Sequence, residues 1–312
     1  MDLLSRLLAL MPVSGRLDVR CHFGAPWRLD EPPAEAREIP WHVLLSGHAV
    51  VQHAGGASTP MQAGDIVLFP SGAAHVLHDG GGEPPTHADA HVAHAHVANG
   101  ITVATNDGPG ERADVLCGRF LLPAVPQRLL RENLPAQLVV RSQRDGAAPS
   151  DRLLRLIALM RDEALDAAPG SQSLIHHLSG ALFALTLRYA SEDDAPPRSL
   201  LALARRPRLQ PAITAMFDEP GKPWTLPELA ALCHMSRATF ARHFEEALGR
   251  SAADVLTDVR MTLAGRLLAQ GNAPVAEVGE TVGYQSDAAF QRVFKRHVGM
   301  TPAQWRAAAA RG

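Results

Sequence analysis

The sequence contains few cysteines and no long apolar run, and each of these absences excludes a class of protein. Its 312 residues include three cysteines, Cys21, Cys117 and Cys233, too few for a paired disulfide framework, so we expect thiols at rest. No stretch approaches the ~18 uninterrupted apolar residues that a membrane helix requires. Residues 1–12 lack both a basic region before their apolar stretch and a cleavage site. We therefore predict a soluble, cytoplasmic protein with no membrane partner.

The composition is that of a folded chain. Apolar residues make up 46% and charged residues 20%, which is typical of a globular protein rather than a disordered or fibrous one. A chain of 312 residues is long enough for two domains whose cores fold without disulfides or metal.

The charges are distributed unevenly along the chain. Residues 1–197 hold 15 Lys and Arg against 22 Asp and Glu, whereas residues 198–312 hold 15 against 10. An acidic segment followed by a basic one is the layout of a sensor attached to a polyanion binder. Domain charges also vary without such a role, so charge alone leaves nucleic-acid binding open.

Breaks in the pattern divide the chain into three parts and predict an α+β protein. Short β-like runs punctuated by Gly and Pro come first, then a Gly-, Pro- and His-rich loop at 80–110 that holds one strand. Apolar residues at helical spacing between 150 and 190 predict two amphipathic helices packed as a hairpin. The run SEDDAPPR at 191–198 then stops the helix. The predicted domains are a β-rich sensor at 1–148, a helical linker and dimerisation hairpin at 149–197, and an all-α domain at 198–312.

One pattern occurs twice in the last hundred residues. Four pairs are separated by 50 positions: Ser236 and Ser286, Phe240 and Phe290, Phe244 and Phe294, Gly249 and Gly299. A serine N-cap starts a helix, and aromatic residues four apart bury one face of it. Each copy therefore predicts a helix-turn-helix whose second helix leaves its other face for DNA. A single copy is equally compatible with a solvated helical bundle, but two copies with the same spacing favour the DNA-binding interpretation.

A helix predicted over 253–269 would join the two copies into one rigid body. Two recognition helices held ~34 Å apart could enter successive major grooves on one side of a duplex. A single chain would then read two half-sites.

The stretch VGYQSDAAFQRVFKRHVGMTPAQWR at 282–306 resembles the signature of the DNA-binding domain of the AraC/XylS family of bacterial transcription regulators. The resemblance implies double-stranded promoter DNA and RNA polymerase as partners and no catalytic residues. By position in the motif, it places base contacts at Ala238, Ala241, Arg242, Ala288, Gln291 and Arg292, with Arg237 on the same face.

The side chains at those positions limit direct readout to few residues, because three of them are alanines. Arg242 can bind guanine O6 and N7 in bidentate fashion, and Gln291 can bind adenine in the same way. Lys295, Arg296 and Arg306 are expected to bind phosphate, which positions the protein without specifying sequence.

The front of the chain has a second resemblance. The spacing Gly64-x5-Pro70-x-Gly72-x2-His75 is similar to the second motif of cupin β-barrels, whose histidine can bind a metal. The first cupin motif is missing, which leaves His42 and His75 as weak metal candidates and gives no reason to assign a cofactor. A cupin-like barrel, a helical hairpin and a double helix-turn-helix together resemble one recurring subfamily of regulators over nearly the whole chain. The stretch PWTLPELAALCHMSRATFARHF at 223–244 also resembles that subfamily.

The histidines concentrate in the front part of the chain. Twelve of the 15 precede residue 198, and His87, His91, His94 and His96 share one loop. Imidazole suits Zn, Cu or Ni, but a metal site requires three or four convergent ligands. A His-rich tract that binds metal weakly or not at all is the favoured interpretation.

The cysteines suggest a response to oxidants. Cys21 lies early and Cys117 late in the barrel sequence, so two thiols from distant segments could meet in one sheet. Arg20, His22 and Arg119 could supply a cationic field that lowers the pKa of these thiols. An early cysteine, a CGxF-like sequence at 117–120 and the opening MDLLSRLLAL resemble those members that respond to reactive chlorine species. The resemblance implies a redox-responsive regulator that acts through Cys21 and Cys117.

Three alternatives stay open. Cys117 is equally interpreted as a small buried apolar residue, and Cys233 is expected in a helical core. The barrel could bind a small organic effector instead. The front half could also be a metal-dependent cupin enzyme fused to a DNA-binding tail.

Overall fold

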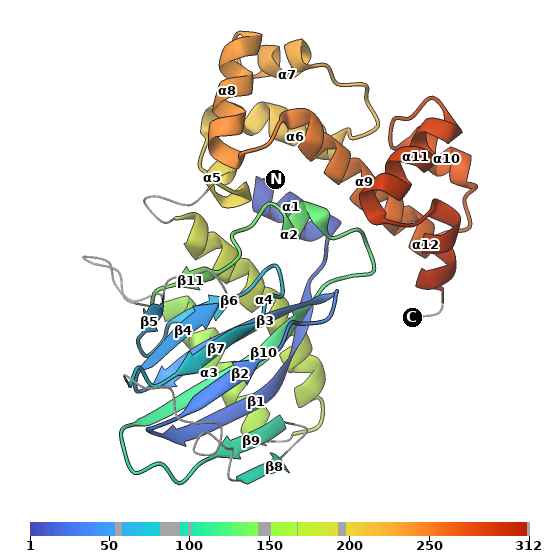
Figure 1. Ribbon diagram of the computed structural model, residues 1–312. Coiled ribbons are helices and arrows are strands. Elements are labelled where there is room, and N and C mark those ends of the chain that lie inside the picture. The colour runs from blue at the N-terminus through green and yellow to red at the C-terminus, as the bar shows by residue number, and fades with distance from the viewer. Residues whose placement is uncertain are drawn as a thin grey trace. The chain divides into compact units, whose positions relative to one another are not determined.

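The computed structural model describes residues 1–53, 58–81, 94–98, 101–142, 151–166, 168–192 and 198–310. It divides into two compact units, which we call the β unit and the helical unit (Figure 1). The β unit comprises Val13–Leu121 and Ala136–Ala190, and the helical unit comprises Met1–Pro12, Leu122–Pro135 and Ser191–Gly312.

The β unit contains two sheets. The seven-stranded sheet has the order β11 (Leu138–Val140), β6 (Ile66–Leu68), β3 (Glu38–Ser46), β10 (Arg112–Leu121), β1 (Ser14–Gly24), β9 (Ile101–Thr105) and β8 (His94–Ala98). The four-stranded sheet has the order β2 (Arg28–Glu31), β7 (His75–His78), β4 (Ala49–His53) and β5 (Thr59–Met61). In the described residues no strand pairing joins the two sheets into a closed barrel. The arrangement is a two-sheet sandwich of the jelly-roll kind.

The core of the β unit lies between the two sheets. Buried apolar side chains of one cluster come from both, among them Cys21 and Cys117 of the larger sheet and Val51 and Leu77 of the smaller one. Alternate residues of a strand point to opposite faces, so every second residue contributes to this core.

Two helices, α3 (Asp151–Asp166) and α4 (Ser171–Ser191), cover the outer face of the larger sheet (Figure 1). Trp41 stacks on Phe120 with ring centroids 5.6 Å apart, and Phe120 meets Phe183 of α4 edge to face at 4.9 Å. Because both faces of the sheet are covered, β3 is buried from Glu38 to Leu44 and reads as a nearly continuous apolar run.

The helical unit is built from ten α-helices and one 3-10 helix in the described residues. They are α1 (Leu3–Leu10), α2 (Arg128–Arg131), α5 (Leu200–Ala204), η1 (Pro207–Leu209), α6 (Gln210–Asp218), α7 (Leu226–Leu232), α8 (Arg237–Leu248), α9 (Ala252–Gln270), α10 (Val275–Thr281), α11 (Asp287–Val298) and α12 (Pro302–Ala309). In Figure 1, α8 and α11 lie toward opposite ends of α9. None of the described helices is both long and apolar enough to cross a membrane.

Segments distant in sequence complete the helical unit. Arg6 of α1 donates two hydrogen bonds to the carboxylate of Asp218 in α6, at 2.8 and 2.6 Å. Pro126, from the segment that follows β10, packs against Gly265 of α9, where a Cβ atom would lie 2.1 Å from the proline ring. The C-terminal helices therefore share their core with the first residues of the chain and with the segment after β10.

The predicted α+β class is confirmed, and the helix predicted over 253–269 is α9. The loop at 80–110 differs from the prediction of one strand, because its described residues form both β8 and β9. The boundaries predicted at 148 and 197 stay a prediction; by compactness, α3 and α4 group with the β unit.

Candidate functional site

The second helix of each helix-turn-helix copy has the predicted ends. The hydroxyls of Ser236 and Ser286 accept the backbone N–H three residues ahead, at 3.2 and 3.4 Å, so both serines are N-caps. Gly249 and Gly299 end α8 and α11 with φ of 77° and 85°, a left-handed conformation that favours glycine.

The turns before these helices differ by one residue. His234 has the left-handed conformation (φ 53°) in the first turn, and Gly283 (φ 89°) has it in the second. These two positions are 49 apart, whereas the serine N-caps are 50 apart. The second turn is therefore one residue longer, and the two copies are not identical in the way they present the second helix.

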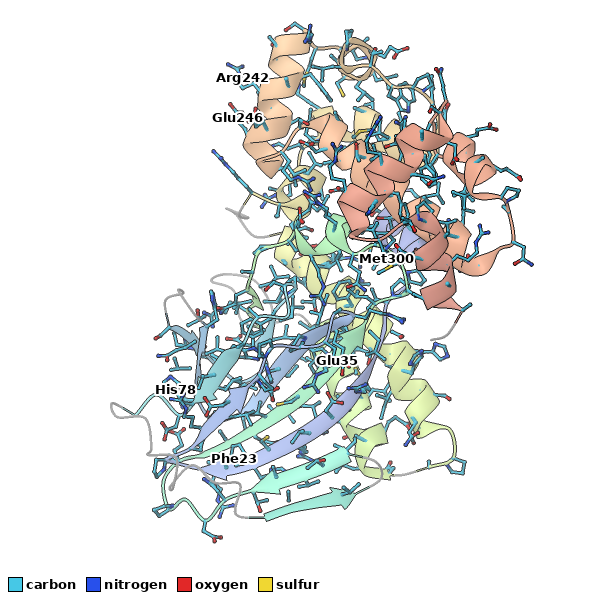
Figure 2. The ribbon with its side chains drawn as sticks, turned by 45° about the vertical axis from the view of Figure 1, so that its right-hand side comes forward. Phe23, Glu35, His78, Arg242, Glu246 and Met300 are labelled. Atoms are coloured by element: carbon cyan, nitrogen blue, oxygen red, sulfur yellow. The ribbon has the colours of Figure 1, made fainter. Side chains whose placement is uncertain are left out.

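Burial separates the two faces of α8 and α11. Phe240, Phe244, Phe290 and Phe294 are fully buried, as predicted. Opposite them lies a surface that we call the basic face: Arg237, Ala238, Arg242, Ala288, Gln291, Arg292, Lys295 and Arg296 are exposed, and Ala241 is half-buried. Figure 2 shows Arg242 and Glu246 extending from the same side of α8.

Neighbouring groups hold two of these side chains only loosely. The Nε atom of Arg242 lies 3.8 Å from Glu246, an exposed pair worth little in water. Gln291 donates a hydrogen bond of 2.8 Å to Asp287. Arg306 departs from the expected surface role, because its guanidinium is half-buried and donates to the backbone carbonyl of Ala273.

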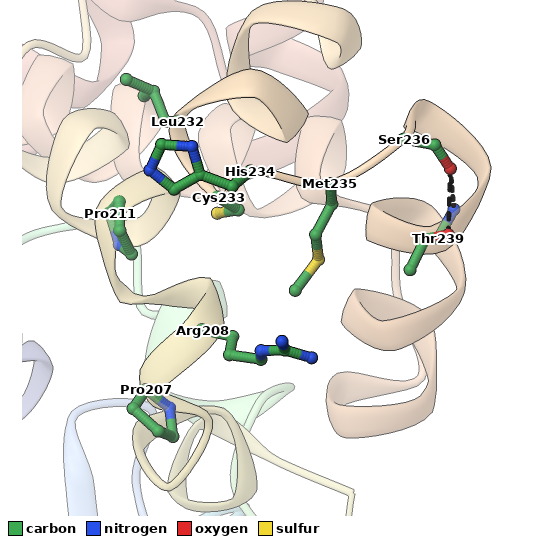
Figure 3. Close-up of a pocket in the computed structure, with 9 residues that line it drawn as sticks. All are labelled: Pro207, Arg208, Pro211, Leu232, Cys233, His234, Met235, Ser236 and Thr239. Carbon is green, nitrogen blue, oxygen red and sulfur yellow. Dashed lines mark hydrogen bonds between the residues drawn. The ribbon is translucent and has the colours of Figure 1, made fainter.

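A hollow of about 480 Å³ opens beside the start of α8 (Figure 3). Arg208 of η1 extends across it toward Met235, next to the hydrogen-bonded pair Ser236 and Thr239. Arg208 is exposed and adds a cation beside the N-terminus of the helix. Sequence reasoning missed it, because η1 follows no repeated pattern.

A buried carboxylate connects the two copies. Asp258 of α9, 1% exposed, accepts hydrogen bonds from Arg250 at 2.5 Å and from Asn133 at 3.3 Å. His297 of α11 lies 3.5 Å from the other carboxylate oxygen. Arg250 follows the first copy and His297 belongs to the second, so both copies meet at one residue of the connecting helix.

In the β unit, the two predicted cysteines lie on adjacent strands. In the register of β1 and β10, Val19 is opposite Cys117 and Cys21 is opposite Val115, which places both cysteines on one face. Both thiols are buried in the same core cluster. The expected meeting of two thiols in one sheet is present.

The prediction that cations lower the pKa of Cys117 is wrong. Arg20 binds Asp114 at 2.7 Å, and Arg119 binds Asp18 and Glu38. The neighbouring thiol of Cys21, together with burial, raises the pKa of the Cys117 thiol well above its usual value. Cys117 is therefore a neutral thiol at rest rather than a preformed thiolate.

The neighbour of Cys117 is His42, which the sequence offered only as a weak metal candidate. His42 of β3 is directly opposite Cys117 in the register, and its Nδ1 lies 3.0 Å from the sulfur. Its Nε2 lies 2.7 Å from Nε2 of His75, which belongs to the smaller sheet. Burial lowers the pKa of both imidazoles, that of His75 to about 4.

These histidines do not fit a cupin metal centre. Both nitrogens of His42 already have hydrogen-bond partners, and Nδ1 of His75 lies 2.9 Å from the carbonyl oxygen of Ala73. Among the residues that the structure describes, no three His, Cys, Asp or Glu side chains are grouped to hold a metal ion.

Of the other histidines, His53 of β4 lies directly opposite His75 in the strand register. His48 binds Glu111 instead. Of the His-rich loop, His87 and His91 lie outside the described residues, as do the side chains of His94 and His96.

A doubled helix-turn-helix with an exposed basic face, joined to a two-sheet β unit, defines a DNA-binding transcription regulator. Residues 2–192 match the cupin family, and residues 229–308 match a helix-turn-helix domain. The chain belongs to the AraC family of helix-turn-helix regulators that carry an N-terminal cupin domain.

Several relatives match nearly the whole chain. The RCS-specific HTH-type transcriptional activator RclR of Escherichia coli K12 is 30% identical over 306 residues, which cover 98% of this chain and 97% of the relative. The HTH-type transcriptional regulator MtrA of Neisseria gonorrhoeae is 28% identical over 310 residues, 98% of each chain. An uncharacterized HTH-type transcriptional regulator of Haemophilus influenzae is 28% identical over 307 residues, again 98% of each.

Proposed function

We propose that this regulator reads two successive major grooves with α8 and α11 and responds to oxidants through Cys21 and Cys117. The observation that carries the oxidant response is the placement of two buried thiols on the same face of adjacent strands, in one core cluster. Similarity to a relative named RCS-specific supports the same response.

The basic face supplies the chemistry for DNA recognition. Arg242 binds guanine and Gln291 binds adenine, once DNA displaces their contacts with Glu246 and Asp287. Arg237 and Arg292 reach base edges or phosphates from the same faces. Lys295 and Arg296 neutralise phosphates, which contributes affinity that is lost as salt concentration rises.

The three alanines on that face have a use in this arrangement. Ala238, Ala241 and Ala288 present methyl groups where a longer side chain would hold the helix away from the groove floor. Apolar side chains of this size contact the methyl group of thymine.

The length of α9 supports binding to adjacent turns of DNA. Its 19 residues rise roughly 28 Å, close to the ~34 Å between successive major grooves on one side of a duplex. We propose RNA polymerase, recruited to the bound promoter, as the second partner beside double-stranded DNA.

The oxidation balances with hypochlorous acid as the oxidant. One thiol attacks the chlorine, the chlorine–oxygen bond breaks, and a sulfenyl chloride and water are formed. The second thiol attacks that sulfur, chloride leaves, and a disulfide forms with loss of one proton. In sum, two thiols and one hypochlorous acid give one disulfide, water and hydrochloric acid.

Chain connectivity supports transmission to the helical unit. Ser14, the first residue of β1, pairs with Leu121, the last residue of β10. Residues 1–12 before β1 and residues 122–135 after β10 belong to the helical unit. A covalent bond between Cys21 and Cys117 constrains the strand pair from whose ends both segments continue.

The hairpin helices support a homodimer. Leu159 and Leu165 of α3 and Leu174 of α4 are 44%, 49% and 38% exposed, more than is usual for leucine. We propose that a second copy covers them. Leu159→Glu is expected to shift the protein toward monomer in sedimentation velocity, and an unchanged dimer would reject this surface.

The oxidant response is tested by measuring promoter binding before and after mild hypochlorite. The Cys21→Ser and Cys117→Ser proteins are expected to lose the change in binding that the unaltered protein shows. Cys233→Ser, which removes a buried thiol of the helical unit, is the matched control and is expected to keep it. A full response in both Cys21→Ser and Cys117→Ser would reject the redox function.

A further inference from the structure

The hydrogen bonds around His42 determine which nitrogen carries each proton. A carbonyl oxygen only accepts, so Nδ1 of His75 is protonated and donates to Ala73. Nε2 of His75, neutral at pH 7, is then an acceptor and receives the Nε2 proton of His42 at 2.7 Å. Nδ1 of His42 therefore has a free lone pair and accepts the thiol proton of Cys117 at 3.0 Å. All three hydrogen bonds therefore point the same way, from the Cys117 sulfur through His42 and His75 to the backbone carbonyl of Ala73.

Position distinguishes the two thiols. The Cys117 sulfur lies 3.0 Å from Nδ1 of His42, and Cys21 lies on the same face of the neighbouring strand. Cys117 therefore has a base beside it, and Cys21 is the second thiol nearby.

We infer that His42 is the base that removes the Cys117 proton as this thiol attacks the oxidant, with Cys21 as the resolving thiol. This inference rests on the proposed redox function and deepens it.

The steps balance as follows. The Cys117 sulfur forms a bond to chlorine, the chlorine–oxygen bond breaks, and its electron pair leaves with hydroxide. The thiol proton moves to Nδ1 of His42 and afterwards returns to solvent as hydroxide becomes water. Cys21 then attacks the Cys117 sulfur, chloride departs, and the Cys21 proton follows to solvent.

His75 is a positioning residue, because it acts through His42. Its ring stacks on Phe69 with centroids 3.7 Å apart and is held there by the bond to Ala73. A ring fixed in this way keeps its lone pair aimed at His42. Since His75 comes from the smaller sheet, the chain of hydrogen bonds crosses the core of the sandwich.

Other titratable groups around Cys117, His42 and His75 favour neutral imidazoles and a protonated thiol. Arg119 of β10 lowers the pKa of both His42 and His75, and His53 of β4 lowers that of His75. Glu31 of β2 and Asp18 of β1 raise the pKa of Cys117. The resting site is thus a thiol beside a free base, and the proton moves only when the sulfur reacts.

This arrangement predicts a pH signature. With a built-in base, disulfide formation depends little on pH between about 6 and 8, apart from the ionisation of the oxidant itself. In His42→Asn the reaction must wait for spontaneous thiolate, whose fraction rises about tenfold per pH unit below the thiol pKa. Dividing the variant's rate by that of the unaltered protein in the same buffer cancels the oxidant's own titration.

The experiment follows Cys21–Cys117 disulfide formation by quenched-flow mass spectrometry after adding hypochlorite. The His42→Asn rate is expected to be roughly 10²-fold lower at pH 7, and the ratio to rise about tenfold per pH unit. A ratio constant with pH would show a purely structural role and overturn the inference. His22→Asn, beside Cys21 in sequence but on the opposite strand face, is the control and should leave the ratio near one.

A second measurement needs no substitution of the histidine. In ¹⁵N-labelled full-length protein, long-range proton–nitrogen correlations are expected to show His42 protonated at Nε2 and unprotonated at Nδ1. A proton at Nδ1 would overturn the inference even if His42→Asn fails to fold. Absence of any Cys21–Cys117 disulfide in the unaltered protein would instead reject the redox function itself.

Discussion

The Nε2 atom of His297, in the second helix-turn-helix copy, lies 3.5 Å from the Oδ1 atom of Asp258, which is 1% exposed. The other oxygen of the same carboxylate binds Arg250, directly after the first copy. A carboxylate buried this deeply is stable only with such partners, because an unpaired buried charge costs several kcal/mol. Arg250 therefore supplies the compensating charge, and His297, whose pKa is lowered chiefly by burial, packs beside the carboxylate from the second copy.

Asp258→Ala is expected to destabilise the helical unit by about 3 kcal/mol, because Arg250 and Asn133 lose their common acceptor. The free energy of unfolding measured in urea checks this value. Asp254→Ala, on the same helix, removes only a capping-box acceptor and should cost about 1 kcal/mol. Equal losses in the two variants would contradict the bridging role of Asp258.

Arg242→Ala and Lys295→Ala are expected to weaken DNA binding in different ways. Removing a guanine contact should cost ~1–3 kcal/mol on the cognate site and relax specificity at one base pair. Removing a phosphate contact should weaken matched and scrambled DNA alike and reduce the salt dependence. Titrations of both variants on both DNAs distinguish the roles. If Arg242→Ala lost the same binding free energy on matched and scrambled DNA, base readout by Arg242 would be rejected.

Gly283→Ala is expected to destabilise the second helix-turn-helix copy by about 2 kcal/mol. Its φ is 89°, and an added Cβ would lie 2.5 Å from the carbonyl oxygen of Gly221 and 2.9 Å from Arg260. Gly299→Ala has a similar φ of 85° but no atom within 4 Å, so it isolates the backbone strain alone. The midpoint of thermal unfolding should be lower for Gly283→Ala than for Gly299→Ala. The reverse order would contradict the steric argument.

The repeated pattern of the last hundred residues could be predicted because it is local. Ser236, Phe240 and Gly249 act within one helix, through a cap, a buried stripe and a left-handed end, and all three recur in the second copy. Asp258 escaped prediction because its partners Asn133 and Arg250 lie far apart or outside any periodic pattern.

The cysteine site could be predicted only in part. That Cys21 and Cys117 meet follows from two long strands of one sheet. That His42 lies opposite Cys117 depends on the register of β3 and β10, which no short motif reveals. The prediction that Arg20 and His22 place positive charge beside the thiol of Cys21 could have been avoided. The residues before and after a strand residue point to the opposite face of the sheet.

Buried, neutral His75 makes the stability of the β unit depend on pH. Its pKa is lowered from 6.5 to about 4, chiefly by burial, so between these values the unfolded chain binds a proton that the folded chain does not. Stability contributed by this residue is therefore complete above pH 6.5 and falls as the pH drops toward about 4. The loss amounts to ~3 kcal/mol, and His42, whose pKa is also lowered, adds to it in the same direction.

Unfolding in guanidinium between about pH 4 and 7 measures this dependence. His75→Gln keeps an acceptor for His42 but cannot titrate, so its stability should vary with pH by ~3 kcal/mol less than that of the unaltered protein. His22→Asn removes a half-buried histidine near Asp114 and serves as the control, with the pH dependence from His75 retained. If His75→Gln and His22→Asn gave the same pH profile as the unaltered protein, His75 would not be held neutral in the folded state. The base proposed for Cys117 would then lack the acceptor that orients it.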